Sequence, residues 1–114
     1  MSEKVKQFYK KFDADTEKMK KMVPGMMTGF GGLFQKTMGE GKLTVREKEL
    51  IALGIAMSIQ CKPCIFLHVK KCLAAGATKE EILEAAQVSV MMSGGPGFTH
   101  MPEVIDALEA NGQQ

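Results

Sequence analysis

The strongest constraint on the fold is an apolar stretch that directly follows a helix start signal. Thr44-Val45-Arg46-Glu47 fits a capping box, in which the Thr44 hydroxyl accepts from the backbone N–H of Glu47 and the Glu47 side chain reaches back. The run that follows, LIALGIAMSI, contains no charged residue. Because a helix that is apolar on every side is a buried one, we predict that Val45 to Ile59 forms the central core helix.

Similar signals divide the rest of the chain into helices. A second capping box begins at Thr78, Gly76 is placed to end the helix before it, and glycine and proline interrupt the chain at 23–25 and 93–97. No segment shows sustained strand alternation, so the predicted fold is all-α, with about six helices in a compact domain. Besides the central helix, we predict helices over Lys4 to Met22, Met26 to Met38, Cys61 to Ala74, Thr78 to Met92, and Met101 or Pro102 to Leu108.

The length and composition restrict the class of protein. With 114 residues, 45% of them apolar, the chain is expected to form one domain over 1–114 with its own core. The apolar run is too short to span a bilayer, which needs about 20 residues, and the N-terminus MSEKVKQFYKKFD has no apolar signal core. The net charge of +2 does not favour nucleic acid. We therefore expect a cytoplasmic protein without membrane or nucleic-acid partners.

Two further patterns leave alternatives open. Lysines crowd the first segment, while the chain from Glu80 onward has six acids and neither Lys nor Arg. These charges belong either to solvated helix faces or to basic and acidic segments that meet within or between subunits. Among the ten methionines, Met26, Met27, Met91 and Met92 are expected to pack in the core, with a flexible pocket or a subunit contact as the alternative.

The segment IQCKPCIFLHVKKC holds all three cysteines and one of the two histidines. Cys61, Cys64, His68 and Cys72 are spaced three, four and four apart, along one stripe of a helix. A helix separates the first and last of them by about 16 Å, whereas zinc ligands lie roughly 4 Å from one another. A straight helix therefore cannot bring all four to one ion. A site of Cys61, Cys64 and His68 completed by Glu49 or His100 is the metal-binding alternative.

A redox-active pair explains the same residues more fully. Pro63 is tolerated in the first helical turn, which places Cys61 at or beside the N-cap and Cys64 in the first turn, where the helix dipole favours a thiolate. His68 lies one turn beyond Cys64 and can take its proton, while the second cysteine can convert an adduct into a disulfide. Cys72, by contrast, is expected to be a small apolar filler.

Glu49 lies in the first turns of the apolar helix, beside Leu53 and Ala56. One interpretation is that it is close enough to the helix start to reach water. If it is covered, it needs a hydrogen-bonding partner, and an imidazole would suit it. Glu49 would then orient His68, and His68 would serve Cys64 in a proton relay. His100 follows the glycine-rich break and is predicted to be a loop residue that could approach the site from a neighbour.

Taken together, Glu49, Cys61, Cys64 and His68 resemble the motif of alkylhydroperoxidase D-like members of the carboxymuconolactone decarboxylase family. That motif is a glutamate, eleven residues, then C-x-x-C-x-x-x-H, and the resemblance extends from about Pro24 to Leu108. It implies an all-helical fold that assembles as a homotrimer or homohexamer. It also implies a peroxidase or disulfide reductase of small hydroperoxides in antioxidant defence, reduced by a lipoyl-bearing or thioredoxin-like partner, with no bound cofactor.

Within that resemblance, Cys64 would be the peroxide-attacking thiolate and Cys61 the more exposed resolving thiol, with Glu49 and His68 as the relay. One position departs from the best-studied type, which has a second histidine where this chain has Pro63. C-K-P-C instead resembles thioredoxin-type disulfide exchange. The alternatives are a carboxymuconolactone-type decarboxylase, which has no evident need for a cysteine pair, and a non-enzymatic redox sensor or metal-binding oligomer.

Overall fold

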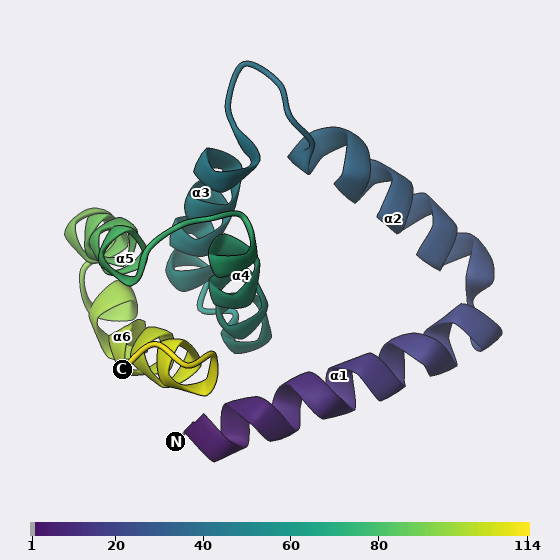
Figure 1. The fold of residues 1–114 in the computed structure, drawn as a ribbon, viewed down its shortest axis with the longest axis horizontal. Coiled ribbons are helices and arrows are strands. Elements are labelled where there is room, and N and C mark those ends of the chain that lie inside the picture. The colour runs from purple at the N-terminus through teal and green to yellow at the C-terminus, as the bar shows by residue number, and fades with distance from the viewer. Residues whose placement is uncertain (1) are drawn as a thin grey trace.

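Six helices, joined by short turns and one longer loop, make up the chain in a computed structural model that describes residues 2–114 (Figure 1). No strand occurs among these residues, so the all-α prediction is confirmed. Within the same range, no helix combines the length and apolarity needed to cross a membrane. The helices are α1 (Ser2–Met22), α2 (Pro24–Met38), α3 (Val45–Ser58), α4 (Lys62–Ala74), α5 (Lys79–Ser93) and α6 (Gly95–Ala110).

Helix α3 lies at the centre and packs against α4, α5 and α6. Large, fully buried side chains from these four helices fill the core, so burial of apolar surface holds them together. They are Leu53, Met57, Ile65, Val69, Ile82 and Val104. The start of α1 joins this core through buried Val5 and through Tyr9, whose hydroxyl donates to the Phe66 carbonyl at 2.6 Å and accepts from Asn111 at 3.0 Å.

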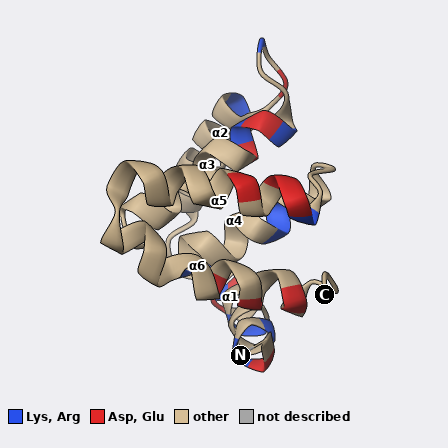
Figure 2. Cartoon of the chain, turned by 90° about the vertical axis from the view of Figure 1, so that its left-hand side faces the viewer, with Lys and Arg blue, Asp and Glu red and all other residues tan. Residues whose placement is uncertain are grey.

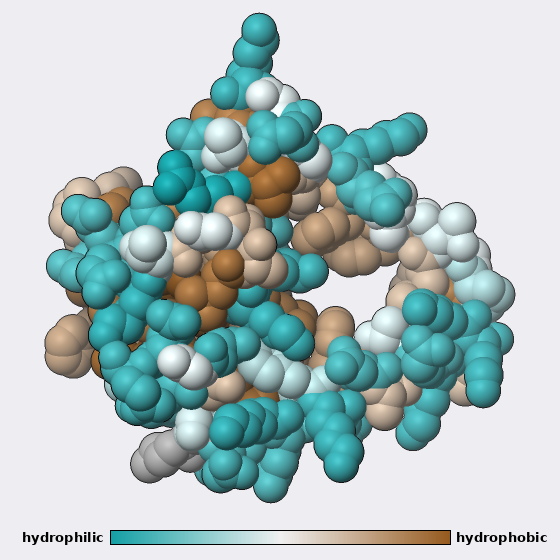
Figure 3. All heavy atoms as spheres, in the orientation of Figure 1, coloured by the Kyte–Doolittle hydropathy of each residue, from teal (hydrophilic) through white to brown (hydrophobic). Residues whose placement is uncertain are grey.

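The rest of α1 and the whole of α2 extend away from the core as an arm, residues 13–38 (Figure 1). Its contact with α4 includes the Lys71 ammonium, 4.7 Å from the centre of the Phe34 ring. The space-filling view shows an opening between this arm and the rest of the molecule (Figure 3). The arm is therefore attached mainly at its two ends.

Both predicted capping boxes are present. Thr44 accepts from the Glu47 N–H at 3.1 Å and Glu47 accepts from the Thr44 N–H at 2.8 Å, and Thr78 and Glu81 pair in the same way. Gly76 has a φ of +93°, and the N–H groups on either side of it bond back to the last turn of α4. Local side-chain signals thus determine where α3 and α5 begin and where α4 ends.

The prediction of a broad break at 93–97 is wrong, because α6 already begins at Gly95. Gly94 alone makes the turn, with a φ of +66°, and Pro96 lies in the first helical turn, where its missing N–H is not needed. A Cβ on Gly97 would lie 2.8 Å from the Val90 Cα, so glycine here permits the close approach of α6 to α5. His100 is consequently a helical residue, and not a loop residue as predicted.

The expectation that α3 is buried on every side is also wrong. Its buried face carries Glu49, Leu53, Ala56 and Met57, whereas Ile51, Ile55 and Ile59 remain 51%, 55% and 65% exposed. The core assignment fails in the same way for three methionines, because Met26, Met91 and Met92 are more than half exposed. An apolar sequence here produces an apolar surface as well as a core.

Charged residues of α1 pair locally. Within residues 2–114, the lysines of α1 that form ion pairs do so with acids one turn away in α1 itself. This favours the interpretation that these charges form a solvated helix face. Figure 2 shows that charged residues on α5 and α6 lie away from the turn that joins these helices, and the surface around that turn is free of them.

Candidate active site

The cysteine pair lies at the start of α4, as predicted. Gln60 has a φ of +58°, and this left-handed residue turns the chain between α3 and α4. Cys61 then forms the N-cap, and its Sγ accepts from the backbone N–H of Cys64 at 3.3 Å. The two cysteines form a disulfide with their Cα atoms 5.2 Å apart. In the reduced pair, the Cys64 N–H favours negative charge on the Cys61 sulfur, and the positive end of the helix dipole favours it on both sulfurs.

Glu49 and His68 are in direct contact. The Glu49 Oε1 lies 2.7 Å from the His68 Nδ1, and Glu49 is only 3% exposed. The interpretation that Glu49 reaches water at the start of the helix is therefore wrong. An ionised carboxylate can only accept, which assigns a proton to Nδ1 and leaves Nε2 free to accept or release another. This tertiary contact links α3 to α4 and gives the buried carboxylate the partner that it needs.

A small cavity of about 220 Å³ brings Cys64 and His68 together. Its other walls are apolar and come from one face of α3 and the following residue, namely Ala52, Ile55, Ala56 and Ile59. Of these wall residues, sequence analysis singled out only Ala56, although their spacing of three, one and three is that of a single helix face. The cavity fits a small substrate with an apolar part, positioned between a sulfur atom and an imidazole.

Cys72 stands apart from this chemistry. It is fully buried, and burial, together with the nearby negative charge of Glu49, raises the pKa of its thiol to about 12. The thiol therefore stays protonated at neutral pH, and the predicted role as an apolar filler is confirmed.

We expect Cys72 to resist alkylation. In the folded, reduced protein, iodoacetamide should label two thiols, and the third only after denaturation.

The raised pKa of Cys72 should also make stability fall at high pH. Because the folded pKa of about 12 exceeds the unfolded value of about 8.5, the unfolded chain loses this proton first. Stability from this group is therefore complete below about pH 8.5 and declines toward pH 12. Urea titrations of wild type and Cys72→Ala should show a smaller decline in the variant; equal declines would contradict this account.

The second histidine belongs to a separate cluster that sequence analysis missed. The His100 Nδ1 contacts the Glu103 carboxylate, and the other oxygen of Glu103 lies 3.4 Å from the Lys62 ammonium. The H-x-x-E spacing is the signal that could have revealed this pair, but it was hidden because the helix was predicted to begin at Met101 or Pro102.

The metal-binding alternative is not supported by this arrangement. Cys61 and Cys64 are bonded to each other, His68 turns its Nδ1 to Glu49, and His100 contacts Glu103. Across residues 2–114, no group of three or more His, Cys, Asp or Glu side chains is arranged to hold an ion. The structure brings together Glu49, Cys61, Cys64 and His68, and leaves His100 outside.

A disulfide at a helix start, with a carboxylate-bound imidazole one turn beyond it, defines a dithiol–disulfide site on an all-helical scaffold. The sequence profile of the carboxymuconolactone decarboxylase family matches residues 24–107, which include all four site residues. The chain therefore belongs to this family. Two similar proteins are an uncharacterized protein from Cupriavidus necator, 32% identical over 76% of this chain and 80% of its own length, and an uncharacterized protein of the cox locus in Paracoccus denitrificans, 36% identical over 70% and 72%.

Solved structures share the fold. A carboxymuconolactone decarboxylase family protein from Legionella pneumophila superimposes with a TM-score of 0.85, at 34% identity, covering 97% of this chain and 98% of that one. A Thermotoga maritima protein has a TM-score of 0.84 at 28% identity, with 95% of both chains covered. A second structure of it, with a TM-score of 0.70 at 30% identity over 75% of this chain and 89% of that one, carries a description suggesting involvement in antioxidative response.

Proposed function

We propose that this protein is a thiol-dependent peroxidase or disulfide reductase for small hydroperoxides, acting in antioxidant defence in the cytoplasm. The observation that carries the proposal is the shared cavity, in which Cys64 meets an imidazole that is held by a buried carboxylate. Family membership and the description of the Thermotoga relative support the same chemistry.

In the first step, the Cys64 thiol gives its proton to the His68 Nε2, and the thiolate attacks the terminal oxygen of the hydroperoxide. The O–O bond breaks, an S–O bond forms, and the departing alkoxide takes the proton back from His68. The products are a Cys64 sulfenic acid and an alcohol, so sulfur is oxidised by two electrons as the peroxide is reduced. Glu49 positions the imidazole and stabilises it while it carries the extra proton.

In the second step, the Cys61 thiol attacks the sulfenic sulfur and releases water, which leaves the Cys61–Cys64 disulfide seen in the structure. A dithiol reductant, such as a lipoyl-bearing or thioredoxin-like protein, then exchanges with this disulfide and returns both cysteines to thiols while it becomes oxidised itself. Pro63 in the C-K-P-C turn supports this exchange function. The same proposal has the chain acting as a homo-oligomer, a homotrimer or homohexamer.

Two other functions fit less of the site. Lactone decarboxylation, which the family name suggests, has no evident use for the disulfide-bonded pair. A redox sensor would use the same pair, but would have no need of the cavity that places an imidazole beside Cys64. The cavity therefore favours turnover of a small molecule over a purely structural response.

The direct test is a single turnover without reductant. Reduced protein mixed with one equivalent of a small alkyl hydroperoxide should consume it and form one disulfide per chain. Both thiols that react with iodoacetamide should be lost. The peroxide is followed by a dye assay, and the disulfide by mass spectrometry. Oxidation of the protein no faster than that of free cysteine would exclude the peroxidase. In that case, rapid reduction of the Cys61–Cys64 disulfide by dihydrolipoamide would indicate a disulfide reductase, and no reduction would indicate an inert disulfide.

A further inference from the structure

We infer that helix α2 of one copy of this chain packs into the groove between α3 and α5 of another copy. The inference rests on the homo-oligomer proposed above and deepens it by naming the two surfaces that join. It does not depend on the thiol chemistry, because neither surface includes the cysteine pair. Within residues 2–114 each surface is left without a partner, and both surfaces are apolar and exposed.

The first surface is an apolar stripe on α2. None of the α2 residues, all of which the structure describes, is buried. Met26, Phe30 and Leu33 are 55%, 65% and 61% exposed, and their spacing of four and three places them on one face. A large phenyl ring and two long aliphatic side chains along one helix face are the pattern of a helix that docks in a groove.

The composition of α2 makes outside packing necessary. Four of its fifteen residues are glycines, and each weakens a helix relative to alanine. A Cβ built on any of these four, Gly25, Gly29, Gly31 or Gly32, would meet nothing within 4 Å among the described residues, so the chain's own packing does not require them. A short helix of this composition is marginal in water, and its stability must come from tertiary or quaternary burial. Glycine also lets a second backbone approach closely.

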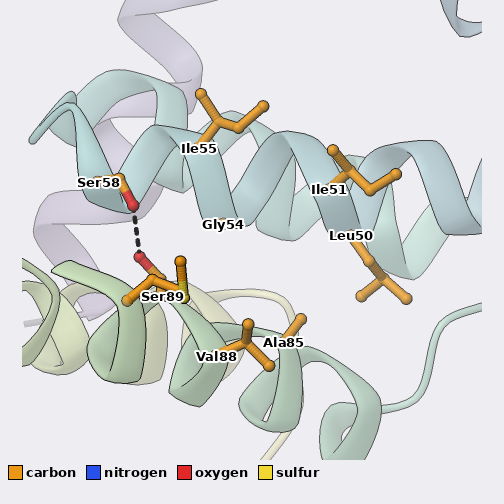
Figure 4. A pocket seen from close by; sticks show the side chains of 9 residues that line it. Leu50, Ile51, Gly54, Ile55, Ser58, Ala85, Val88 and Ser89 are labelled. Atoms are coloured by element: carbon orange, nitrogen blue, oxygen red, sulfur yellow. Dashed lines mark hydrogen bonds between the residues drawn. The ribbon is translucent and has the colours of Figure 1, made fainter.

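The second surface is a groove of about 390 Å³ between α3 and α5 (Figure 4). Its rim carries the exposed side chains Ile51, Ile55, Val88 and Met92. At one end of the groove, the hydroxyls of Ser58 and Ser89 bond to each other at 2.9 Å across the two helices, so they satisfy one another and do not call for a polar ligand. The groove is therefore built for an apolar occupant.

The absence of charged residues from both surfaces also favours α2 as the occupant of the groove. The groove is formed by two stretches without Lys, Arg, Asp or Glu, 50–61 and 85–102, and Figure 2 shows the uncharged side of the molecule that results. The α2 surface comes from a third such stretch, 22–35. Absence of charge at the centre is the mark of a stable protein interface, and it argues against a charged peptide or a lipid headgroup as the occupant.

A chain cannot fill its own groove in this structure. Figure 1 shows α2 and α5 on opposite sides of α3 and α4, and α2 makes no contact with α5 within the described chain. The arm holds α2 out from the core, where it can reach a second molecule, and an arm-to-groove contact repeated around a closed homo-oligomer would satisfy both surfaces of every copy.

Such a contact also bears on the thiol site. Ile55 lines both the groove and the cavity that contains Cys64 and His68, and Ile59, another wall residue of that cavity, is exposed at the surface. An α2 helix seated over Ile55 forms part of the outer wall of the cavity. The substrate entrance is then shared between two copies.

Complementation between two variants tests the contact. Phe30→Glu places a charge on the arm, Val88→Glu places one in the groove, and Gln35→Glu, on the other side of α2, is the matched control. By light scattering coupled to size exclusion, wild type and the control should exceed the single-chain mass of 12.4 kDa, and each of the first two variants should fall to it. Mixed in equal amounts, these two should form pairs of about twice that mass, because one intact arm still meets one intact groove.

The outcomes separate the alternatives. A monomeric wild type, or a Phe30→Glu protein that keeps the full mass, overturns the inference. Pairs absent from the mixture also overturn it, because a symmetric contact of groove with groove, or α2 folding over its own groove, gives no complementation. Cooperative thermal unfolding of each variant verifies that its core is folded. Single-turnover peroxide consumption by wild type is measured separately, so failure of the thiol chemistry leaves this result intact.

Discussion

Replacing either cysteine of the pair by serine should stop catalytic turnover, but the two variants should stop at different points. Cys64→Ser removes the sulfur that shares the cavity with His68, so it should consume no hydroperoxide beyond the uncatalysed rate. Cys61→Ser keeps that sulfur and should consume about one equivalent per chain before stalling as the Cys64 sulfenic acid, because the resolving thiol is absent. Wild type should turn over continuously with dihydrolipoamide as reductant.

The measurements are peroxide loss over time and trapping of the sulfenic acid with dimedone, read as a mass increase on the peptide that contains Cys64. Cys72→Ala is the matched control, because its thiol is buried with a pKa near 12 and should not contribute to turnover. If both variants turned over like wild type, the proposed chemistry would be excluded. If the stalled species formed in Cys64→Ser and not in Cys61→Ser, the two roles would be reversed.

Local signals in the sequence were sufficient to place most helices. Capping residues at Thr44 and Thr78 and the glycine after α4 act through nearest neighbours, and the structure keeps all three. The start of α6 could not be read in this way, because it depends on close packing of Gly97 against α5, a contact between separate helices. A cluster of glycines and proline is typical of a loop until such a contact is known.

Burial was harder to predict than helix position. An apolar run shows that water is unfavourable around it, but it does not identify the chain that excludes the water. For this reason Ile51, Ile55 and Met92 were expected in the core and are instead at the surface. The same limit applied to the site: Cys61, Cys64 and His68 follow from helix geometry, whereas the contact between Glu49 and His68 joins two helices and is visible only in three dimensions.

Changing either residue of the Glu49–His68 contact should strongly slow the reduction of the hydroperoxide. His68→Gln should lower kcat/KM for the hydroperoxide by about 10²- to 10⁴-fold, as expected for loss of a general base. Glu49→Gln should lower it by roughly 10- to 100-fold, because the amide oxygen still accepts from Nδ1 but no longer carries the charge that stabilises a protonated imidazole. The isosteric change leaves no cavity, so cooperative thermal unfolding should persist. Glu103→Gln, which alters the other histidine–carboxylate pair, should leave the rate unchanged.

The double variant decides whether Glu49 acts through His68. A positioning residue loses its effect once the group that it positions is gone, so Glu49→Gln combined with His68→Gln should be no slower than His68→Gln alone. If the two losses multiplied, Glu49 would act on the reacting atoms by another route, such as its field at the nearby sulfurs. Because Glu49 is buried and its nearest polar partner is the His68 Nδ1 at 2.7 Å, full non-additivity is the expected result.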